Sequence, residues 1–371
     1  MALVVFILLL SFLVIIHELG HFLAARHSGI RILEFGIGYP PRLLALFKKG
    51  KTLFSLNWLP FGGFVRLAGD DAETVEQQGS SVVDEHGAVV PRGELFAEQP
   101  QYKRLYVVLA GATVNILFGI LMFASLYMYL GIPENLPHPV VNEIAAGSPA
   151  ETAQLRKGDV LLRVEDVSIA SAEEFIIQIQ KHRGAVVKVE FQRNGTSMTA
   201  EPYVRTLQET PQNQGSLGVA LTDTEWRRYP WWQMIPRGIW RGVQDSYFFA
   251  KQILVALGQM ITTIAQKREV PKDISGPIGI VYMAEKEQIL QQGPLALANF
   301  AGLLSLNLGV MNLLPIPALD GGRAVFVLLE RLLGKKRRAR VEQTANAIGM
   351  TLLLALILFI SIKDVVVIFR R

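Results

Sequence analysis

Long apolar runs separated by polar stretches dominate the hydrophobic pattern of this chain. Three runs are long enough to cross a membrane as helices, which takes roughly 20 apolar residues; they cover 3–25, 105–130 and 350–369. A fourth run at 295–314 is weaker, because asparagines and glycines interrupt it. The pattern therefore predicts a polytopic α-helical membrane protein with four transmembrane helices.

The pattern changes in the middle of the chain. Hydropathy drops there and strand-like alternation begins, as in VKVEF at 187–191, which predicts a small α+β domain. We expect four parts. They are an N-terminal membrane half at 1–135, the α+β domain at 136–205, a linker with an amphipathic helix at 206–290, and a C-terminal membrane half at 291–371.

Composition supports a membrane protein, since 50% of the residues are hydrophobic and the mean hydropathy is +0.31. The net charge of +5 includes no basic stripe interleaved with aromatic residues, so a nucleic-acid partner is not expected. Cysteine is absent, which excludes disulfides and thiolate metal ligands. The first apolar run has neither a basic leading segment nor a clear cleavage site, and we expect a retained span rather than a signal peptide.

The first predicted span contains the ionisable stretch HELGH, which includes His17, Glu18 and His21. On a helix, residues i and i+4 lie on one face, so both imidazoles can reach the same metal ion. Glu18 lies beside them and can take a proton from an activated water and deliver it to a leaving amine. Ionisable groups at bilayer depth cost at least ~2.5 kcal/mol each, so a functional site is favoured over a chance pattern.

A second candidate lies where the fourth apolar run ends, in NLLPIPALDGG at 312–322. Pro315 and Pro317 should break the helix, and the two glycines after Asp320 should free the backbone. A catalytic zinc site uses three protein ligands and one open position. A carboxylate at a helix break beside the membrane is well placed to be the third ligand.

The two motifs together resemble the site-2 protease family of intramembrane zinc metalloproteases, and in particular its bacterial RseP-type branch. The resemblance rests on HELGH and LDGG, and also on FGIGYPP from Phe35, GGFVRLAGD from Gly62 and SGPIGI from Ser275. It implies one Zn²⁺ bound by His17, His21 and Asp320, with Glu18 as the general base. One departure is AGATVN from Ala110, where relatives show AGPxxN: Ala112 replaces the proline and Asn115 is retained.

The same resemblance implies how a substrate would be held. A glycine-rich stretch at 57–70 looks like a membrane-re-entrant β-loop that pairs with an extended substrate strand. Further positions that match the family's substrate-binding residues are Asn307, Asn312, Pro315, Pro317, Gly62, Gly63 and Phe64. The expected substrate is the transmembrane segment of a single-pass protein already shortened outside the cell, such as an anti-sigma factor, and remnant signal peptides are also possible substrates. This activity would be a step of regulated intramembrane proteolysis.

The α+β region resembles a PDZ domain, and its marks are GSPAE from Gly147 and KGDVLLRVED from Lys157. PDZ domains bind an extended peptide at a sheet edge, so a peptide ligand is one expected partner. A purely structural domain that gates access to the site stays an alternative. Some relatives carry two PDZ domains in tandem, whereas this chain has room for one.

Charge gives an independent prediction of topology. Basic residues dominate the connection at 26–66, and KKRRAR at 335–340 lies between the last two predicted spans, which marks both connections as cytoplasmic loops. HELGH and LDGG then approach the same cytoplasmic half of a bacterial inner membrane, and the PDZ domain lies outside the cytoplasm. The segment at 243–266 is a rival fifth span. We expect it to lie on the membrane surface or to be partly re-entrant, because a fifth crossing would reverse the span before LDGG and bring Asp320 out on the wrong side. The tryptophans before it also favour the membrane interface.

Two other functions stay open from the sequence. In the first, the motifs hold a metal in a scaffold or a transporter without hydrolysis, although paired broken helices typical of transporters are not visible. In the second, the chain is a membrane-anchored PDZ adaptor whose site has decayed. The presence of Glu18 favours an enzyme, because a scaffold needs ligands but no base.

Overall fold

The computed structural model describes residues 2–70, 89–267, 276–289 and 291–369. The chain divides into two compact units, one formed by 1–129 with 235–371 and the other by 130–234. Each unit has its own buried hydrophobic clusters. The predicted α+β domain at 136–205 falls inside the second unit.

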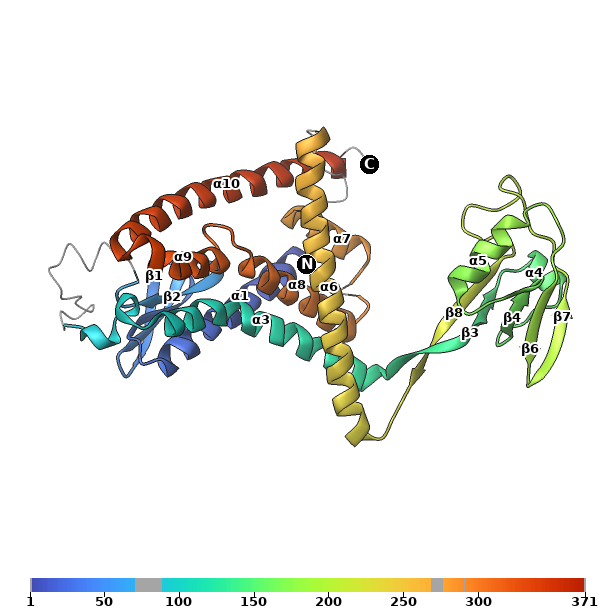
Figure 1. Cartoon of the computed structure of the whole chain (residues 1–371), viewed down its shortest axis with the longest axis horizontal. Helices are drawn as coiled ribbons and strands as arrows, with labels where there is room; N and C mark the ends of the chain where they lie inside the picture. The colour runs from blue at the N-terminus through green and yellow to red at the C-terminus, as the bar shows by residue number, and fades with distance from the viewer. Residues whose placement is uncertain (1, 71–88, 268–275, 290, 370–371) are drawn as a thin grey trace. The chain divides into compact units, whose positions relative to one another are not determined.

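The first unit consists of long α-helices and one long β-hairpin (Figure 1). Its elements are α1 (Ala2–His27), β1 (Ile32–Lys49), β2 (Thr52–Leu67), the short 3-10 helices η1 (Arg92–Glu94) and η2 (Phe96–Glu98), α3 (Gln101–Leu130), most of α6 (Trp231–Lys267), α7 (Pro277–Lys286), α8 (Pro294–Leu313), α9 (Asp320–Leu333) and α10 (Lys335–Phe369). Four stretches are long and apolar enough to cross a membrane: Leu3–His27, Gln101–Leu130, Pro294–Leu313 and Arg337–Ile368. The prediction of four apolar helices is confirmed in length and composition.

The segment at 243–266 belongs to the 37-residue helix α6. Within the described residues, α6 is not among the helices that qualify as candidate spans. Its first half exposes the tryptophans Trp231, Trp232 and Trp240. The number of candidate spans among the described residues, four, agrees with the number predicted from the sequence. The position of α6 relative to a membrane stays a prediction.

The basic run KKRRAR does not form the loop expected from the sequence, so that part of the prediction was wrong, while its cytoplasmic side stays a prediction. It begins helix α10, where lysine and arginine have high helix propensity. Arg338 is 6% exposed and forms ion pairs with Glu330 on α9 and with Glu342 one turn further along α10. Part of the basic run is therefore used inside the protein to hold α9 against α10.

Glycines determine how closely the helices of the first unit pack. A Cβ atom at Gly20 of α1 would lie 2.7 Å from the carbonyl oxygen of Ala110 on α3. A Cβ atom at Gly309 of α8 would lie 2.9 Å from the carbonyl oxygen of Ala112 on α3. Small residues allow such backbone contacts between membrane helices. Helix α3 is therefore packed tightly between α1 and α8.

The hairpin of β1 and β2 is antiparallel and packs on α1. Aromatic side chains join the two, since the ring of Phe22 lies 5.5 Å from that of Phe35 and 5.9 Å from that of Phe54. In the hairpin, the buried carboxylate of Glu34 accepts two hydrogen bonds from Arg42. These contacts fix the hairpin beside the middle and the end of α1.

The second unit is built on a six-stranded antiparallel sheet with the order β7-β6-β4-β3-β8, in which β5 also pairs with β4. Its elements are β3 (Ile132–Ile144), α4 (Pro149–Thr152), β4 (Val160–Val164), β5 (Val167–Ser168), α5 (Ala172–Lys181), β6 (Val189–Arg193), β7 (Thr196–Ala200) and β8 (Val219–Arg227). The core includes Phe175 of α5 and Phe191 of β6, both 2% exposed. Strand β8 forms one edge of the sheet.

Local sequence signals explain the turns of the second unit. Ser148 and Ser171 each accept a hydrogen bond from the backbone N–H three residues on, at the start of α4 and α5. In the KGD turn, the Asp159 carboxylate is 1% exposed and accepts hydrogen bonds from the Arg156 backbone N–H and the Arg193 guanidinium. Asp159 raises the pKa of Arg193 through that hydrogen bond.

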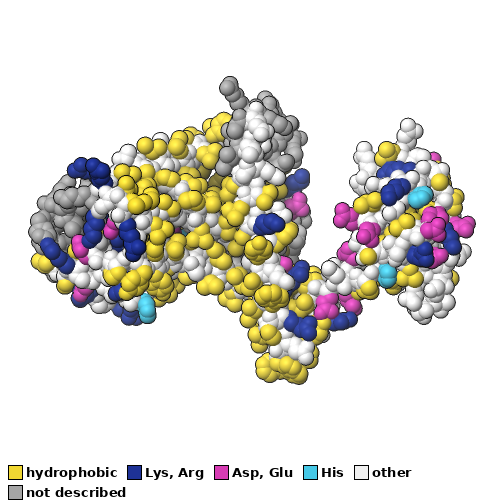
Figure 2. All heavy atoms as spheres, in the orientation of Figure 1, with side chains coloured by type: hydrophobic (Ala, Val, Ile, Leu, Met, Phe, Trp, Pro, Cys, Tyr) yellow, Lys and Arg dark blue, Asp and Glu magenta, His cyan; other side chains and the backbone are white. Residues whose placement is uncertain are grey.

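The two units differ on their surfaces (Figure 2). Hydrophobic side chains lie openly on α10 and α6, including Leu352, Leu358, Phe359 and Phe248. Charged side chains of both signs are distributed over the sheet unit. An exposed apolar helix surface of this kind is what contact with lipid requires.

Candidate metal centre

The two histidines of HELGH and the aspartate of LDGG converge at one point in the first unit. His17 Nε2 lies 2.9 Å and His21 Nε2 lies 3.3 Å from Oδ2 of Asp320. The two Nε2 atoms are 3.1 Å apart. The histidines come from α1 and the aspartate from the first turn of α9, so residues 300 positions apart in sequence form one cluster.

The break between α8 and α9 places Asp320. Helix α8 ends at Leu313, as the prolines predict, and α9 begins at Asp320. The two following glycines are needed for another reason than backbone freedom, because neither has a positive φ. A Cβ atom at Gly321 would lie 2.2 Å from the carbonyl oxygen of Leu314, and one at Gly322 would lie 2.2 Å from that of Ile316. The first turn of α9 thus packs directly on the connection before it.

Helix α3 forms the third wall of the cluster, which the sequence analysis did not identify. The carbonyl oxygen of Val107 is 2.8 Å from Nδ1 of His21. A Cβ atom at Gly111 would lie 2.4 Å from Nε2 of His21 and 2.7 Å from Nε2 of His17. Gly111 therefore keeps open the space in front of both ligand nitrogens.

Asn115 lies one turn beyond Gly111 and is fully buried. Its Nδ2 is 3.4 Å from Nδ1 of His17, and its backbone carbonyl accepts a hydrogen bond from Ser305 of α8. Its Oδ1 has no hydrogen-bond partner within the described part of the chain. Val107, Gly111 and Asn115 are four residues apart and lie on one face of α3. The AGATVN motif was the sequence signal for two of them.

The geometry fits a zinc ion. Two ligand atoms bound tetrahedrally at about 2.0–2.1 Å are about 3.3 Å apart, close to the three separations of 2.9, 3.1 and 3.3 Å. Asp320 Oδ2 is buried yet makes no hydrogen bond among the described residues. Two neutral imidazoles and one carboxylate are a donor set typical of zinc. The absence of a Cβ at Gly111 leaves room for the ion.

Glu18 and the hairpin lie on the side of α1 next to the histidines. A Cβ atom at Gly63 of β2 would lie 3.6 Å from Cγ of Glu18, and one at Gly62 would lie 3.2 Å from Cγ1 of Val14. The Phe64 ring fills the space beside Gly36 of the paired strand β1. The structure thus brings Gly62 and Gly63 to the turn of α1 that carries Glu18.

The other predicted substrate residues lie on α8 and just after it. Asn307 and Asn312 are half-buried on α8, and no hydrogen bond of either side chain is found within the described ranges. Pro315 and Pro317 lie in the connection to α9. Pro317 packs on α10, where a Cβ atom at Gly349 would lie 2.7 Å from its carbonyl oxygen.

Ion pairs anchor α9, and with it Asp320, to its neighbours. Arg104 of α3 is 3% exposed and donates two hydrogen bonds of 2.7 Å to Glu330. The Arg104 guanidinium holds the pKa of the Glu330 carboxyl below its usual range. At the other end of α9, Arg323 pairs with Asp70, which follows β2. The helix that carries Asp320 is thus tied to both α3 and the hairpin.

Comparison with known proteins identifies the family. The model of peptidase family M50 matches residues 5–356. A zinc metalloprotease RasP from Geobacillus kaustophilus is 29% identical, with 97% of this chain and 96% of the relative covered. A putative zinc metalloprotease from Clostridium acetobutylicum is 31% identical over 98% of this chain and 97% of its own length. The regulator of sigma-W protease RasP from Bacillus subtilis is 25% identical, with 98% and 97% covered.

Among solved structures, the PDZ domain of an SdrC-like protein from Listeria monocytogenes matches 24% of this chain and 93% of its own, at 20% identity and a TM-score of 0.21. The family match extends over both membrane halves and includes HELGH and LDGG. The recognition made from the sequence is confirmed, and so is the prediction of a metalloprotease. The chain belongs to peptidase family M50, the site-2 protease family of zinc metalloproteases.

Proposed function

We propose that this protein cleaves the transmembrane segments of single-pass membrane proteins, using one zinc ion held by His17, His21 and Asp320. The observation that carries the proposal is the convergence of three ligand atoms within 2.9–3.3 Å, from a helix long and apolar enough to span a membrane and from a helix break far along the chain. A soluble protease needs no such placement of its metal. A protease of membrane helices does.

A zinc ion held by His17, His21 and Asp320 would supply Lewis acidity toward a peptide carbonyl and toward water at neutral pH. Glu18 is the general base. Its carboxylate takes a proton from the attacking water and then gives that proton to the nitrogen of the departing amine. The position of Glu18 between the histidine turn and Gly63 supports this role, because the substrate backbone must pass close to both.

The α3 helix controls where the histidine protons sit. With both Nε2 atoms directed at the metal position, each Nδ1 must carry the ring proton. His21 Nδ1 then donates to the Val107 carbonyl. For His17, the side-chain amide of Asn115 can be rotated by 180°, which exchanges the positions of its O and N atoms. In that orientation Oδ1 accepts the hydrogen bond from His17 Nδ1–H. That orientation also gives the buried Oδ1 a partner.

Substrate binding is the next element of the proposal. A transmembrane helix satisfies its own backbone hydrogen bonds, so the segment around the scissile bond must be unwound and given new partners. We assign this task to β2 around Gly62, Gly63 and Phe64, which lies beside Glu18. Further partners are Asn307 and Asn312 of α8, whose amides can bind freed backbone groups, and Pro315 and Pro317, which shape the break next to them.

The substrate class follows from the family and from the site. A relative carries the name regulator of sigma-W protease, which supports an anti-sigma factor type of substrate, already shortened on the outer side, in regulated intramembrane proteolysis. We place the protein in the bacterial cytoplasmic membrane with the metal near the cytoplasmic side. The basic residues of the hairpin connection support this orientation.

The sheet unit is proposed to be a PDZ domain on the outer side of the membrane. This unit has a cavity of about 340 Å³ between α5 and β8. Another cavity, of about 440 Å³, lies in the first unit. Apolar residues of α5 and β8 line the smaller cavity, among them Ile176, Ile179, Val219 and Leu221. Because β8 is an edge strand, an extended peptide could add to it there. A peptide ligand is therefore proposed at this groove.

The decisive experiment replaces Glu18 with Gln in the purified full-length protein. The variant should keep stoichiometric zinc and the wild-type melting temperature but lose cleavage of a model single-pass substrate, because Gln cannot accept the proton. Glu173→Gln, at an exposed position on α5, is the matched control and should stay fully active. Full cleavage by the Glu18→Gln variant would exclude the proposed mechanism.

A further inference from the structure

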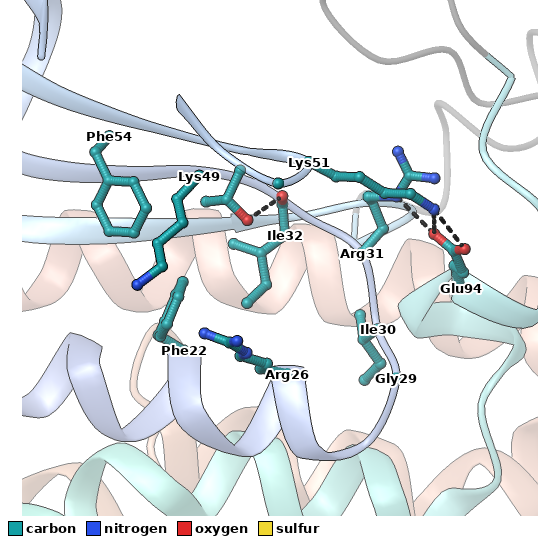
Figure 3. Close-up of a pocket in the computed structure, with 12 residues that line it drawn as sticks. Phe22, Arg26, Gly29, Ile30, Arg31, Ile32, Lys49, Lys51, Phe54 and Glu94 are labelled. Atoms are coloured by element: carbon teal, nitrogen blue, oxygen red, sulfur yellow. Dashed lines mark hydrogen bonds and ion pairs between the residues drawn. The ribbon is translucent and has the colours of Figure 1, made fainter. Parts of the chain in front are cut away.

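A cavity of about 440 Å³ lies between the last turn of α1, the outer end of the hairpin and η1 (Figure 3). It is separate from the metal cluster and none of its lining residues belongs to that cluster. Its walls combine apolar and cationic side chains. They include the apolar Phe22, Ile30, Ile32 and Phe54 and the cationic Arg26, Arg31, Lys49 and Lys51.

The cavity has more positive charge than its own carboxylate can balance. Glu94 is the only acidic lining residue, and it is occupied by Arg31 at 2.5 Å and by Lys51 at 3.0 Å. Arg26 and Lys49 instead both extend toward Phe22 and line the same cavity (Figure 3). Within the described ranges neither has a carboxylate partner. Two like charges that share a cavity without a counter-ion favour the binding of an anion.

The position of the cavity, at the end of a candidate membrane span, limits what that anion can be. Arg26 lies in the last turn of α1, at the end of the candidate span Leu3–His27. The end of an apolar span is where a membrane changes from hydrocarbon to headgroups. The hairpin strand beside the cavity also exposes Leu44 and Phe47, which are 55% and 56% exposed. These residues suit a ligand that has both an anionic head and acyl chains.

The interaction of a cation with the C-terminal end of helix α1 explains only part of this arrangement. A cation in the last turn of a helix interacts favourably with the helix dipole, which is reason enough for Arg26 to be basic. It does not explain why Lys49, from a different element, extends into the same space. Nor does it explain the cavity between them.

We propose that this cavity binds the phosphate of one anionic phospholipid, with Arg26 and Lys49 as its ligands and the rings of Phe22 and Phe54 against the glycerol and the first acyl carbons. Basic pockets at the membrane boundary bind such headgroups. The lipid would join the end of α1 to the hairpin. Because the same hairpin carries Gly63 next to Glu18, the lipid would stabilise the hairpin that we assign to substrate binding.

The test uses the delipidated full-length protein in a neutral detergent and measures bound lipid by native mass spectrometry. The probes are dioctanoyl phosphatidylglycerol, dioctanoyl phosphatidylcholine and inorganic phosphate. The wild type should bind one phosphatidylglycerol in preference to phosphatidylcholine. The double variant Arg26→Gln/Lys49→Gln should bind it at least roughly tenfold more weakly, since it removes both of the basic residues proposed to bind the anionic headgroup.

The matched control is Lys48→Gln/Arg92→Gln, which removes the same charge from the hairpin and η1 at exposed positions that do not line the cavity. It should bind phosphatidylglycerol within about twofold of the wild type. Arg26→Lys/Lys49→Arg, which keeps both charges, should retain binding and shows that the site tolerates substitution. Zinc content verifies that each variant is folded.

Three results would overturn the proposal. Equal binding of phosphatidylcholine would show that the phosphate charge is not what the cavity recognises. Equal losses in the two double variants would show a general surface charge effect. Displacement of phosphatidylglycerol by inorganic phosphate at the same concentration would assign the site to a soluble anion instead of a lipid.

Discussion

Buried polar side chains have different meanings in the two units of this protein. In the sheet unit, the carboxylate of Asp159 is almost fully buried and accepts hydrogen bonds from the Arg193 guanidinium and the Arg156 backbone N–H. These hydrogen bonds give Asp159 a structural role in the fold. In the helical unit, Asp320 is directed at two histidines and its Oδ2 has no hydrogen bond within the described ranges. The difference shows that burial alone does not identify a functional carboxylate. An unsatisfied carboxylate oxygen within 3.3 Å of two imidazole nitrogens makes Asp320 a candidate ligand.

The units also differ in how glycine is used. In the sheet unit, glycines such as Gly158 and Gly195 have positive φ and nothing within 4 Å of a built Cβ, as expected at turns. In the helical unit, Gly20, Gly111 and Gly309 lie within helices, where a side chain would strike a neighbouring helix or, at Gly111, the rings of His17 and His21. Glycine provides backbone freedom in one unit and space in the other.

The largest effect is expected from Asp320→Ala, the direct test of the first comparison. The variant should lose stoichiometric zinc, and its activity should fall by more than the roughly 100-fold that follows loss of an outer-shell partner. Metal analysis and a cleavage assay on a helical transmembrane peptide measure both. Asp159→Ala, which removes a more deeply buried carboxylate from the other unit, should keep its zinc. Retained zinc in Asp320→Ala would show that a different residue is the third ligand.

Gly111→Ala should have the next largest effect. The added Cβ would fall within 2.4–2.7 Å of both Nε2 atoms, so zinc affinity should fall by at least roughly 10- to 100-fold. Alanine is the better helix former by about 1 kcal/mol, so the helix itself should not be weakened. Chelator competition gives the affinity. Gly258→Ala on α6, where a Cβ meets nothing within 4 Å, is the control and should bind zinc normally.

Asn115→Leu should weaken zinc binding by roughly 10- to 100-fold, because His17 Nδ1–H loses its acceptor. Asn115→Asp keeps an acceptor at this position and should keep zinc bound. Zinc binding by Asn115→Leu equal to that of the wild type would show that residue 115 is not the acceptor of His17 Nδ1–H, and the proposed proton position on His17 would be wrong. Chelator competition at constant pH distinguishes the two outcomes.

Local spacing explains which parts of the site the sequence could predict. His17 and His21 are one helical turn apart, so a five-residue motif already fixes their common face. The break that places Asp320 was predictable because prolines lack the N–H that a helix requires. Four apolar helices followed from the length and composition of the apolar runs. Each of these predictions uses interactions within a single segment.

The residues that the sequence analysis missed depend on contacts between segments. Gly111 is one of several glycines in an apolar helix, and only the crossing of α3 with α1 gives it a role. The glycines after Asp320 were expected to free the backbone, but they are helical and allow close packing on Leu314 and Ile316. KKRRAR was expected in a loop because charge was considered without the ion pairs that Arg338 makes in α10.

The smallest effect on the metal centre, and the sharpest test of the difference between the units, is expected from Asp159→Ala. Its loss leaves the Arg193 guanidinium without its carboxylate and the Arg156 N–H without its acceptor, which should destabilise the sheet unit by about 2 kcal/mol. Faster hydrogen exchange in β4 and β6 should report this loss. Asp166→Ala, at an exposed position after β4, should leave exchange unchanged. Since the sheet unit provides none of the three ligand atoms, a loss of zinc in Asp159→Ala would mean that its fold also supports the metal centre.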